Sequence, residues 1–112
     1  MTKLQFKNYT YTFDKNEKKI LLNFCDTLLK QMQADENFFQ DVRAFTSITE
    51  KLRSNEYEIK LTKEERTKLV FRIKENLDNM KKQASKGFFI RRWFYKQAYN
   101  QFKNIFEKHF SD

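Results

Sequence analysis

Proline is absent from this sequence, and glycine occurs only once, as Gly87. Both residues interrupt helices, so their scarcity favours long helices joined by short connections. The loops that cradle phosphate groups in P-loop and dinucleotide-binding proteins need several glycines at fixed spacing. A single glycine therefore excludes both of these nucleotide-binding motifs.

Cysteine and histidine are almost absent too, because the chain has one of each, Cys25 and His109. One cysteine cannot form a disulfide within the chain, which is typical of proteins from a reducing compartment. A zinc site built on Cys and His needs more of these ligands. Cys25 shares a helical stripe with Leu21 and Leu29, which predicts a buried, unreactive thiol rather than a nucleophile paired with His109.

The fifteen carboxylates show none of the arrangements expected of an active site. Asp26 precedes Lys30 by four positions, and Glu64 precedes Lys68 by four, which is the spacing of solvated ion pairs on a helix. Acid–base catalysis instead needs carboxylates in surroundings that perturb their pKa. We expect a protein that is not an enzyme and that has no catalytic, metal-binding or cofactor-binding residues.

Long apolar runs are missing as well. No segment approaches the about 18 consecutive apolar residues of a membrane span. The N-terminal sequence MTKLQFKNYTYTF also lacks the apolar run of a signal peptide. We expect no transmembrane segment and a cytoplasmic location.

Apolar side chains are nevertheless plentiful, since hydrophobic residues make up 39% of the chain and 13 residues are Phe. A chain of 112 residues lies in the size range of one domain. Such a chain should bury about two thirds of its unfolded surface. The sequence therefore predicts one domain over residues 1–112, with a core that needs no metal or disulfide.

Capping signals and apolar spacing predict four helices. They begin after Asp14, near Asp35, after Thr62 and at about Phe88. Glu17 and Glu65 follow the first and third caps by three residues, as in a capping box. The third helix should end near Gly87, and the fourth should reach Phe110. The apolar faces of the first three helices consist of Leu21, Leu22, Cys25, Leu28, Leu29 and Met32; Phe38, Val42, Phe45 and Leu52; and Leu69, Val70, Ile73, Leu77 and Met80.

Two short segments, residues 9–13 and 57–61, alternate with a period of two residues, as half-buried strands do. The side chains that share a face are Tyr9, Tyr11 and Phe13 in the first segment, and Tyr57, Ile59 and Leu61 in the second. The predicted fold class is mainly α, with four helices and a minor two-stranded β ribbon that is stabilised by helices packed on it. An alternative is a local hairpin over residues 4–11.

The predicted order of strand, helix and helix in residues 9–53 recurs in residues 57–110. A shift of 48 positions superposes the strand phase, the caps Asp14 and Thr62, and most apolar helix positions. A slip of two more residues then aligns the two Phe-Phe pairs that begin at Phe38 and Phe88. This agreement favours an internal duplication around a pseudo-twofold axis. The alternative is that any two capped amphipathic helices would align equally well.

Positive charge is concentrated in the second half of the chain. Residues 1–55 carry a net charge of +2 and residues 56–112 carry +6, which together make the +8 of the whole chain. No acidic residue occurs between Asp78 and Glu107. Part of this basicity has an alternative explanation in the codon usage of an AT-rich genome, which is typical of a bacterial or phage source.

The predicted fourth helix separates its aromatic residues between two sides. One broad side, expected in the core, consists of Ile90, Phe94, Tyr95, Ala98, Tyr99, Phe102, Ile105 and Phe106. Trp93 and Phe89 fall on the other side, beside basic residues. We name this second surface, with neighbouring lysines, the basic aromatic face and define it by Lys82, Lys86, Phe89, Arg91, Arg92, Trp93, Lys96, Asn100 and Lys103.

Trp and Arg are enriched among the residues that contribute most to protein interfaces. The basic aromatic face therefore predicts a non-catalytic binding protein, a small regulator or inhibitor that docks onto a larger protein with an acidic patch. One alternative is nucleic-acid binding by the same residues. Another is association with a membrane surface. A third alternative is that Trp93 packs within the domain or in a homodimer.

Overall fold

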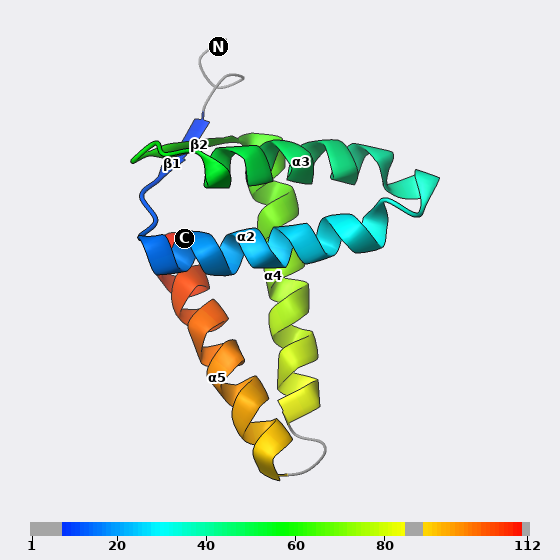
Figure 1. Ribbon diagram of the computed structural model, residues 1–112, viewed down its shortest axis with the longest axis vertical. Helices are drawn as coiled ribbons and strands as arrows, with labels where there is room; N and C mark the ends of the chain where they lie inside the picture. Colours follow the sequence, from blue (N-terminus) through cyan, green and yellow to red (C-terminus); the bar gives the residue numbers. More distant parts are fainter. Residues whose placement is uncertain (1–7, 85–88, 111–112) are drawn as a thin grey trace. The chain divides into compact units, whose positions relative to one another are not determined.

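The computed structural model describes the backbone of residues 8–84 and 89–110 and the side chains of residues 9–82 and 96–110 (Figure 1). The chain forms two compact units, residues 1–69 and residues 70–112. One helix, α4 (Lys63–Ala84), runs across the boundary between the units. The single domain predicted over residues 1–112 stays a prediction.

The first unit contains β1 (Asn8–Tyr11), α2 (Lys15–Met32), the 3₁₀ turn η1 (Glu36–Phe38), α3 (Phe39–Arg53), β2 (Ile59–Thr62) and the first turns of α4. The second unit contains the rest of α4, α5 (Phe89–Ile105) and the π-helical turn η2 (Phe106–Phe110). Across the described residues there are four α-helices and one two-stranded antiparallel sheet, which confirms the predicted mainly α fold class. The predicted end of the third helix at Gly87 lies outside the described residues.

Both predicted capping boxes are formed. In α2, Asp14 Oδ1 accepts a hydrogen bond from the Glu17 amide at 2.7 Å, and Glu17 Oε1 accepts one from the Asp14 amide at 3.0 Å. In α4, Thr62 Oγ1 accepts from the Glu65 amide at 3.1 Å, and Glu65 Oε1 accepts from the Thr62 amide at 2.9 Å. Each box satisfies amides that a helix start leaves without intrahelical partners, so the sequence fixes both helix starts.

The two strands pair antiparallel, with Tyr9 opposite Leu61 and Tyr11 opposite Ile59. Ile59, Leu61 and Tyr11 are buried, as the alternating pattern predicts. Of the alternative hairpin over residues 4–11, only Asn8–Tyr11 are described, and they pair with β2. The ribbon therefore joins segments about 50 positions apart in the sequence.

Tyr57 is a correction to the predicted strand. The alternating pattern placed it on the buried face with Ile59 and Leu61, but its side chain is 77% exposed. The ladder ends at the pair of Tyr11 and Ile59, so no strand residue lies opposite Tyr57 among the described pairs. Within the described ladder, Tyr57 therefore has no cross-strand neighbour whose side chain could cover its ring.

Arg66 joins β1 to the first turns of α4. Its Nε donates a hydrogen bond to the Tyr11 hydroxyl at 3.0 Å, and its guanidinium carbon lies 5.0 Å from the centre of the Tyr9 ring. The rings of Tyr11 and Phe13 stack with their centroids 5.5 Å apart. One arginine thus holds a short strand by a hydrogen bond and by a cation–π contact.

Helices α2 and α3 lie side by side in the first unit (Figure 1). Their buried apolar residues are Leu21, Cys25, Met32, Ala44, Phe45, Ile48 and Leu52. Arg53 of α3 donates to both carboxylate oxygens of Asp26 of α2, at 3.0 and 2.9 Å. The predicted pairing of Asp26 with Lys30 is replaced by this bond between helices, in which one guanidinium nitrogen, Nη2, donates to both oxygens and both partners are charged.

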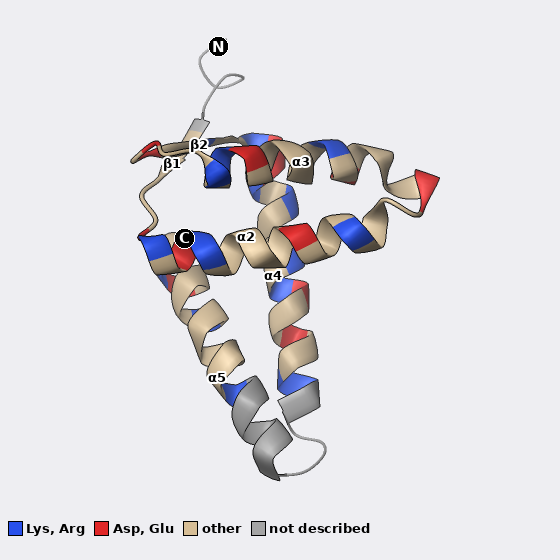
Figure 2. Cartoon of the chain, in the orientation of Figure 1, with Lys and Arg blue, Asp and Glu red and all other residues tan. Residues whose placement is uncertain are grey.

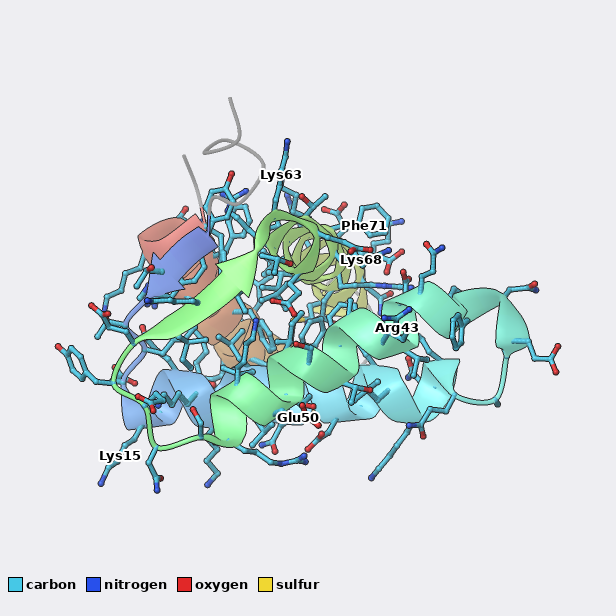
Figure 3. All side chains as sticks on the ribbon, turned by 90° about the horizontal axis from the view of Figure 1, so that it is seen from above. Lys15, Arg43, Glu50, Lys63, Lys68 and Phe71 are labelled. Atoms are coloured by element: carbon cyan, nitrogen blue, oxygen red, sulfur yellow. The ribbon has the colours of Figure 1, made fainter. Side chains whose placement is uncertain are left out.

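A second bond between helices replaces the predicted pairing of Lys68 with Glu64. Lys68 Nζ of α4 donates to Asp41 Oδ1 of α3 at 2.6 Å. In Figure 3, Lys68 lies where α4 faces α3. Neither side chain is fully exposed, so this ion pair is less screened by water than a pair on an open helix surface.

In the second unit, Ile73, Ile105 and Phe110 are buried. The predicted core side of the fourth helix is confirmed where its side chains are described, since Ala98, Tyr99, Phe102 and Phe106 are half-buried. The side chains of Ile90, Phe94 and Tyr95 lie outside the described residues. Lys74 Nζ of α4 lies 5.8 Å from the centre of the Phe106 ring, a cation–π contact within this unit. No helix over residues 8–84 and 89–110 is long and apolar enough to cross a membrane.

Cys25 is fully buried on the stripe with Leu21, as predicted. Burial, together with the neighbouring Asp26 carboxylate, raises the pKa of the Cys25 thiol to about 12. The thiolate, not the thiol, is the nucleophile, so Cys25 is unreactive in the folded protein at neutral pH.

Changing Cys25→Ser should lower the free energy of unfolding by about 1–3 kcal/mol, because a hydroxyl is costlier to bury than a thiol. Urea denaturation would measure this change. A thiol reagent should label native wild-type protein only as fast as it unfolds. The matched control is Cys25→Ser combined with Gln31→Cys, which moves the thiol to an exposed position of the same helix and should label at once. Equally rapid labelling of the wild type would contradict the buried placement.

Glu65 should make stability depend on acid pH. Burial raises the pKa of Glu65, but hydrogen bonds from Lys51, Ser47 and the Thr62 amide outweigh this and hold it below its ordinary value of 4.5. A carboxylate with a lowered folded pKa stabilises the protein above pH 4.5, and the contribution is lost as the pH falls through the folded pKa. Glu65→Gln should therefore cost about 1–2 kcal/mol at neutral pH and flatten the fall in stability below pH 4.5. Denaturation measured from pH 2 to 7 would show both effects. The matched control is Glu64→Gln, at an exposed neighbouring position. Equal acid sensitivity in the two variants would refute the role of Glu65 in the pH dependence of stability.

Candidate protein-binding surface

Three members of the basic aromatic face have described side chains on α5, and all three are exposed: Lys96, Asn100 and Lys103. They are spaced by four and three positions, which places them on one face of the helix. Lys82, on α4, is also exposed. The structure describes the backbone, but not the side chains, of four further members, which belong to α5: Phe89, Arg91, Arg92 and Trp93. The remaining member, Lys86, lies outside the described residues.

The two sides of α5 differ in exposure over the part of the helix with described side chains. Ile105 is buried and Phe102 is half-buried, whereas Lys96 and Asn100 are exposed. Lys103 Nζ lies 6.0 Å from the centre of the half-buried Tyr99 ring, at the border between the two sides. Over this part, one face of α5 exposes Lys96, Asn100 and Lys103 to solvent. The aromatic rings lie half-buried along the other face.

The sequence of α5 contains basic residues and no acidic residue. Figure 2 shows basic but no acidic residues on the described part of α5. Glu107, in η2, is the first acid after Asp78. Clustered charges of one sign raise the local potential and speed encounter with a partner of opposite charge.

Sequence reasoning missed two exposed aromatic residues, Phe39 and Phe71, which are 63% and 60% exposed. The guanidinium carbon of Arg43 lies 6.0 Å from the Phe39 ring, and that of Arg72 lies 6.0 Å from the Phe71 ring. Helical phase could have separated Phe71 from Leu69, which is buried on the same helix. For Phe39 the sequence gives a weaker signal, because η1 interrupts the helical phase just before it.

A hollow of about 430 Å³ lies beside Phe39, at the corner where α2 leads into α3. We name it the α2–α3 hollow, and it is lined by Met32, Gln33, Asp35, Glu36, Phe39 and Val42. Its acidic residues Asp35 and Glu36 are exposed. Figure 2 shows acidic residues at the turn between α2 and α3. The hollow thus combines apolar side chains with an acidic rim.

A second hollow, of about 500 Å³, lies between α3 and the start of α4 in the first unit. It is polar and is lined by Gln40, Arg43, Ala44, Ser47, Thr62, Glu64 and Glu65. Glu65 is already bonded to Thr62 and Lys51, and its lowered pKa keeps it ionised at neutral pH. It is therefore poorly suited to donate a proton in catalysis. Within the described part of the chain, no group of three or more His, Cys, Asp or Glu residues could hold a metal ion.

Comparisons with known proteins give no relative from which a function could be transferred. No protein-family model, curated protein or solved structure matches this chain.

Proposed function

We propose that this protein is a non-catalytic binding protein of the cytoplasm, a small regulator or inhibitor that docks through the basic aromatic face onto an acidic patch of a larger protein. The observation that carries this proposal is the exposed row of Lys96, Asn100 and Lys103 on α5, opposite the half-buried aromatic side. A folded core needs the aromatic side but does not need the basic row. That row is available for a partner.

We also propose that residues 9–53 and 57–110 are two copies of one strand–helix–helix unit. Helices α2 and α4 begin at Lys15 and Lys63, which are 48 positions apart, and both starts are closed by capping boxes. Helices α3 and α5 begin at Phe39 and Phe89, which are 50 positions apart, the shift that the sequence alignment requires. Cys25 and Ile73, equivalent positions in the two copies, are both fully buried.

The proposed duplication bears on the orientation of the basic aromatic face. A shift of 50 positions relates Phe89 to Phe39 and Trp93 to Arg43. Phe39 and Arg43 are exposed on α3. The buried residues Ala44 and Phe45 correspond instead to the predicted core side of α5. By this equivalence, Phe89 and Trp93 are expected to face outward beside Lys96.

Nucleic-acid binding is the second candidate, because the absence of acids between Asp78 and Glu107 also suits a phosphate backbone. Membrane-surface binding has less support. An interfacial helix buries its apolar side among lipids. On α5, Ala98, Tyr99 and Phe102 are already half-buried in the protein.

Trp93→Ala should weaken partner binding by ~2 kcal/mol or more, as expected for a buried interface anchor. It should cost little folding stability if the ring fills no core cavity. Arg92→Ala and Lys96→Ala should weaken binding less and mainly slow association, as charges at an interface rim do. Quantitative pull-downs would measure binding, with Gln101→Ala, exposed on α5 beyond the basic row, as the matched control. A thermal melt showing a loss of ~3–5 kcal/mol for Trp93→Ala would place the ring in the core and reject the anchor.

A salt titration separates protein docking from nucleic-acid binding. Duplex and single-stranded DNA and RNA should bind the chain weakly at all salt concentrations if the partner is a protein. Binding to nucleic acid that falls steeply with rising salt, through counterion release at each phosphate contact, would instead establish the second candidate. The variant Lys96→Ala with Lys103→Ala should then reduce the salt slope by about 2.

A further inference from the structure

The α2–α3 hollow is a second contact surface, separate in the sequence from the basic aromatic face. Phe39 stands at its edge with 63% of its surface exposed, although burying a Phe side chain is worth about 1.5–3 kcal/mol. The hollow is also lined by Val42, which is half-buried, and by Met32, which is buried. An exposed ring beside an apolar hollow is typical of a surface that a partner covers.

We propose that the α2–α3 hollow receives the basic aromatic face of a second copy of this chain. This inference rests on the proposed function, because it uses the same face. It adds that the chain carries the complementary acidic surface itself. The protein would therefore self-associate, and a partner protein that takes the face would compete with this contact.

The acidic rim of the hollow and the described lysines of α5 carry opposite charges. Neither Asp35 nor Glu36 has an ion-pair partner among the described residues, and Asp35 only accepts a hydrogen bond from the Asn37 amide at 2.9 Å. Lys96 and Lys103 of α5 also have no ion-pair partner among the residues that the structure describes. Bringing these groups together would pair carboxylates and ammonium groups that form no ion pair among the described residues.

Unlike the acids at the rim of the hollow, Asp41 is already paired within the chain. It lies on α3, close in sequence to Phe39, but its carboxylate already accepts a hydrogen bond from Lys68 at 2.6 Å. Lys96 and Lys103 are seven positions apart on α5, so their Cα atoms are separated by about 10 Å along the helix axis. The exposed row that contains both lysines can lie along the hollow while one lysine reaches the acidic rim.

This contact joins two different surfaces of the chain. Two copies can therefore exchange both contacts in a closed dimer, or copies can add one after another. The net charge of +8 makes copies repel one another at long range, so association is expected only at high protein concentration. The predicted signature is an average mass that rises with protein concentration.

Sedimentation velocity of the full chain over a hundredfold range of concentration tests the proposal. The average mass of the wild type should rise with concentration above that of a monomer. Glu36→Lys and Phe39→Ala should each weaken self-association by about tenfold or more, as removal of an interface anchor does. Glu50→Lys is the matched control, since it makes the same charge change at an exposed position of α3 outside the hollow, and it should associate like the wild type.

Mixing two variants tests which surfaces meet. One variant, Glu36→Ala with Phe39→Ala, lacks the hollow's contacts, and the other, Lys96→Ala with Lys103→Ala, lacks those of the face. Each should stay monomeric alone, and their equimolar mixture should form a 1:1 dimer, because one intact hollow and one intact face remain. Far-ultraviolet circular dichroism and thermal melts establish that both variants are folded.

A wild type that stays monomeric throughout, a hollow variant that still associates alone, or a mixture that fails to dimerise would each overturn the inference. Its failure is separable from that of the proposed function. A monomeric wild type whose partner binding is lost on Trp93→Ala rejects only the self-association. A wild type that self-associates but loses no partner binding on Trp93→Ala rejects only the docking.

Discussion

The carboxylate of Glu65 is the group on which the arrangement of the first unit depends. It accepts hydrogen bonds from the Thr62 amide at 2.9 Å and from Lys51 Nζ at 2.7 Å, and so joins the end of β2, the start of α4 and the side of α3. It is buried, so loss of Lys51 would leave its charge without an ion-pair partner in a poorly solvated place. One carboxylate that accepts from several donors therefore ties the start of α4 to β2 and α3.

Bonds between helices then decide which side of α3 faces outward. Arg53 bonds with Asp26 of α2, and Asp41 bonds with Lys68 of α4, while Phe45 and Ile48 are buried. With these contacts made, the remaining side of α3 is left to solvent. This side carries Phe39 and part of the α2–α3 hollow. The candidate acidic surface is thus a consequence of how the helices are fastened together.

The two proposed contact surfaces suggest how a small chain without catalytic groups could act. A basic aromatic face that binds either an acidic partner or the hollow of another copy would couple partner binding to self-association. Binding of a partner would then release monomers by mass action. Such coupling needs no conformational change within either unit, only competition for Trp93, Lys96 and their neighbours.

The sequence by itself determined the elements with local causes. Capping boxes at Asp14 and Thr62 set two helix starts, helical phase set the exposed row on α5, and the apolar stripe predicted the burial of Cys25. These features depend on residues within a few positions of one another, so spacing alone encodes them. Much of the predicted face around Trp93 stays a prediction.

Only the tertiary structure decided the features that depend on distant partners. Asp26 could pair with Lys30 on its own helix, but packing brings Arg53 of α3 to within 2.9 Å of its carboxylate. Tyr57 fits the alternating pattern of a strand, but the ladder ends before it and leaves it exposed. The hollow beside Phe39 arises where two helices meet at a turn. Local spacing cannot encode it, because its walls come from segments that fold onto each other.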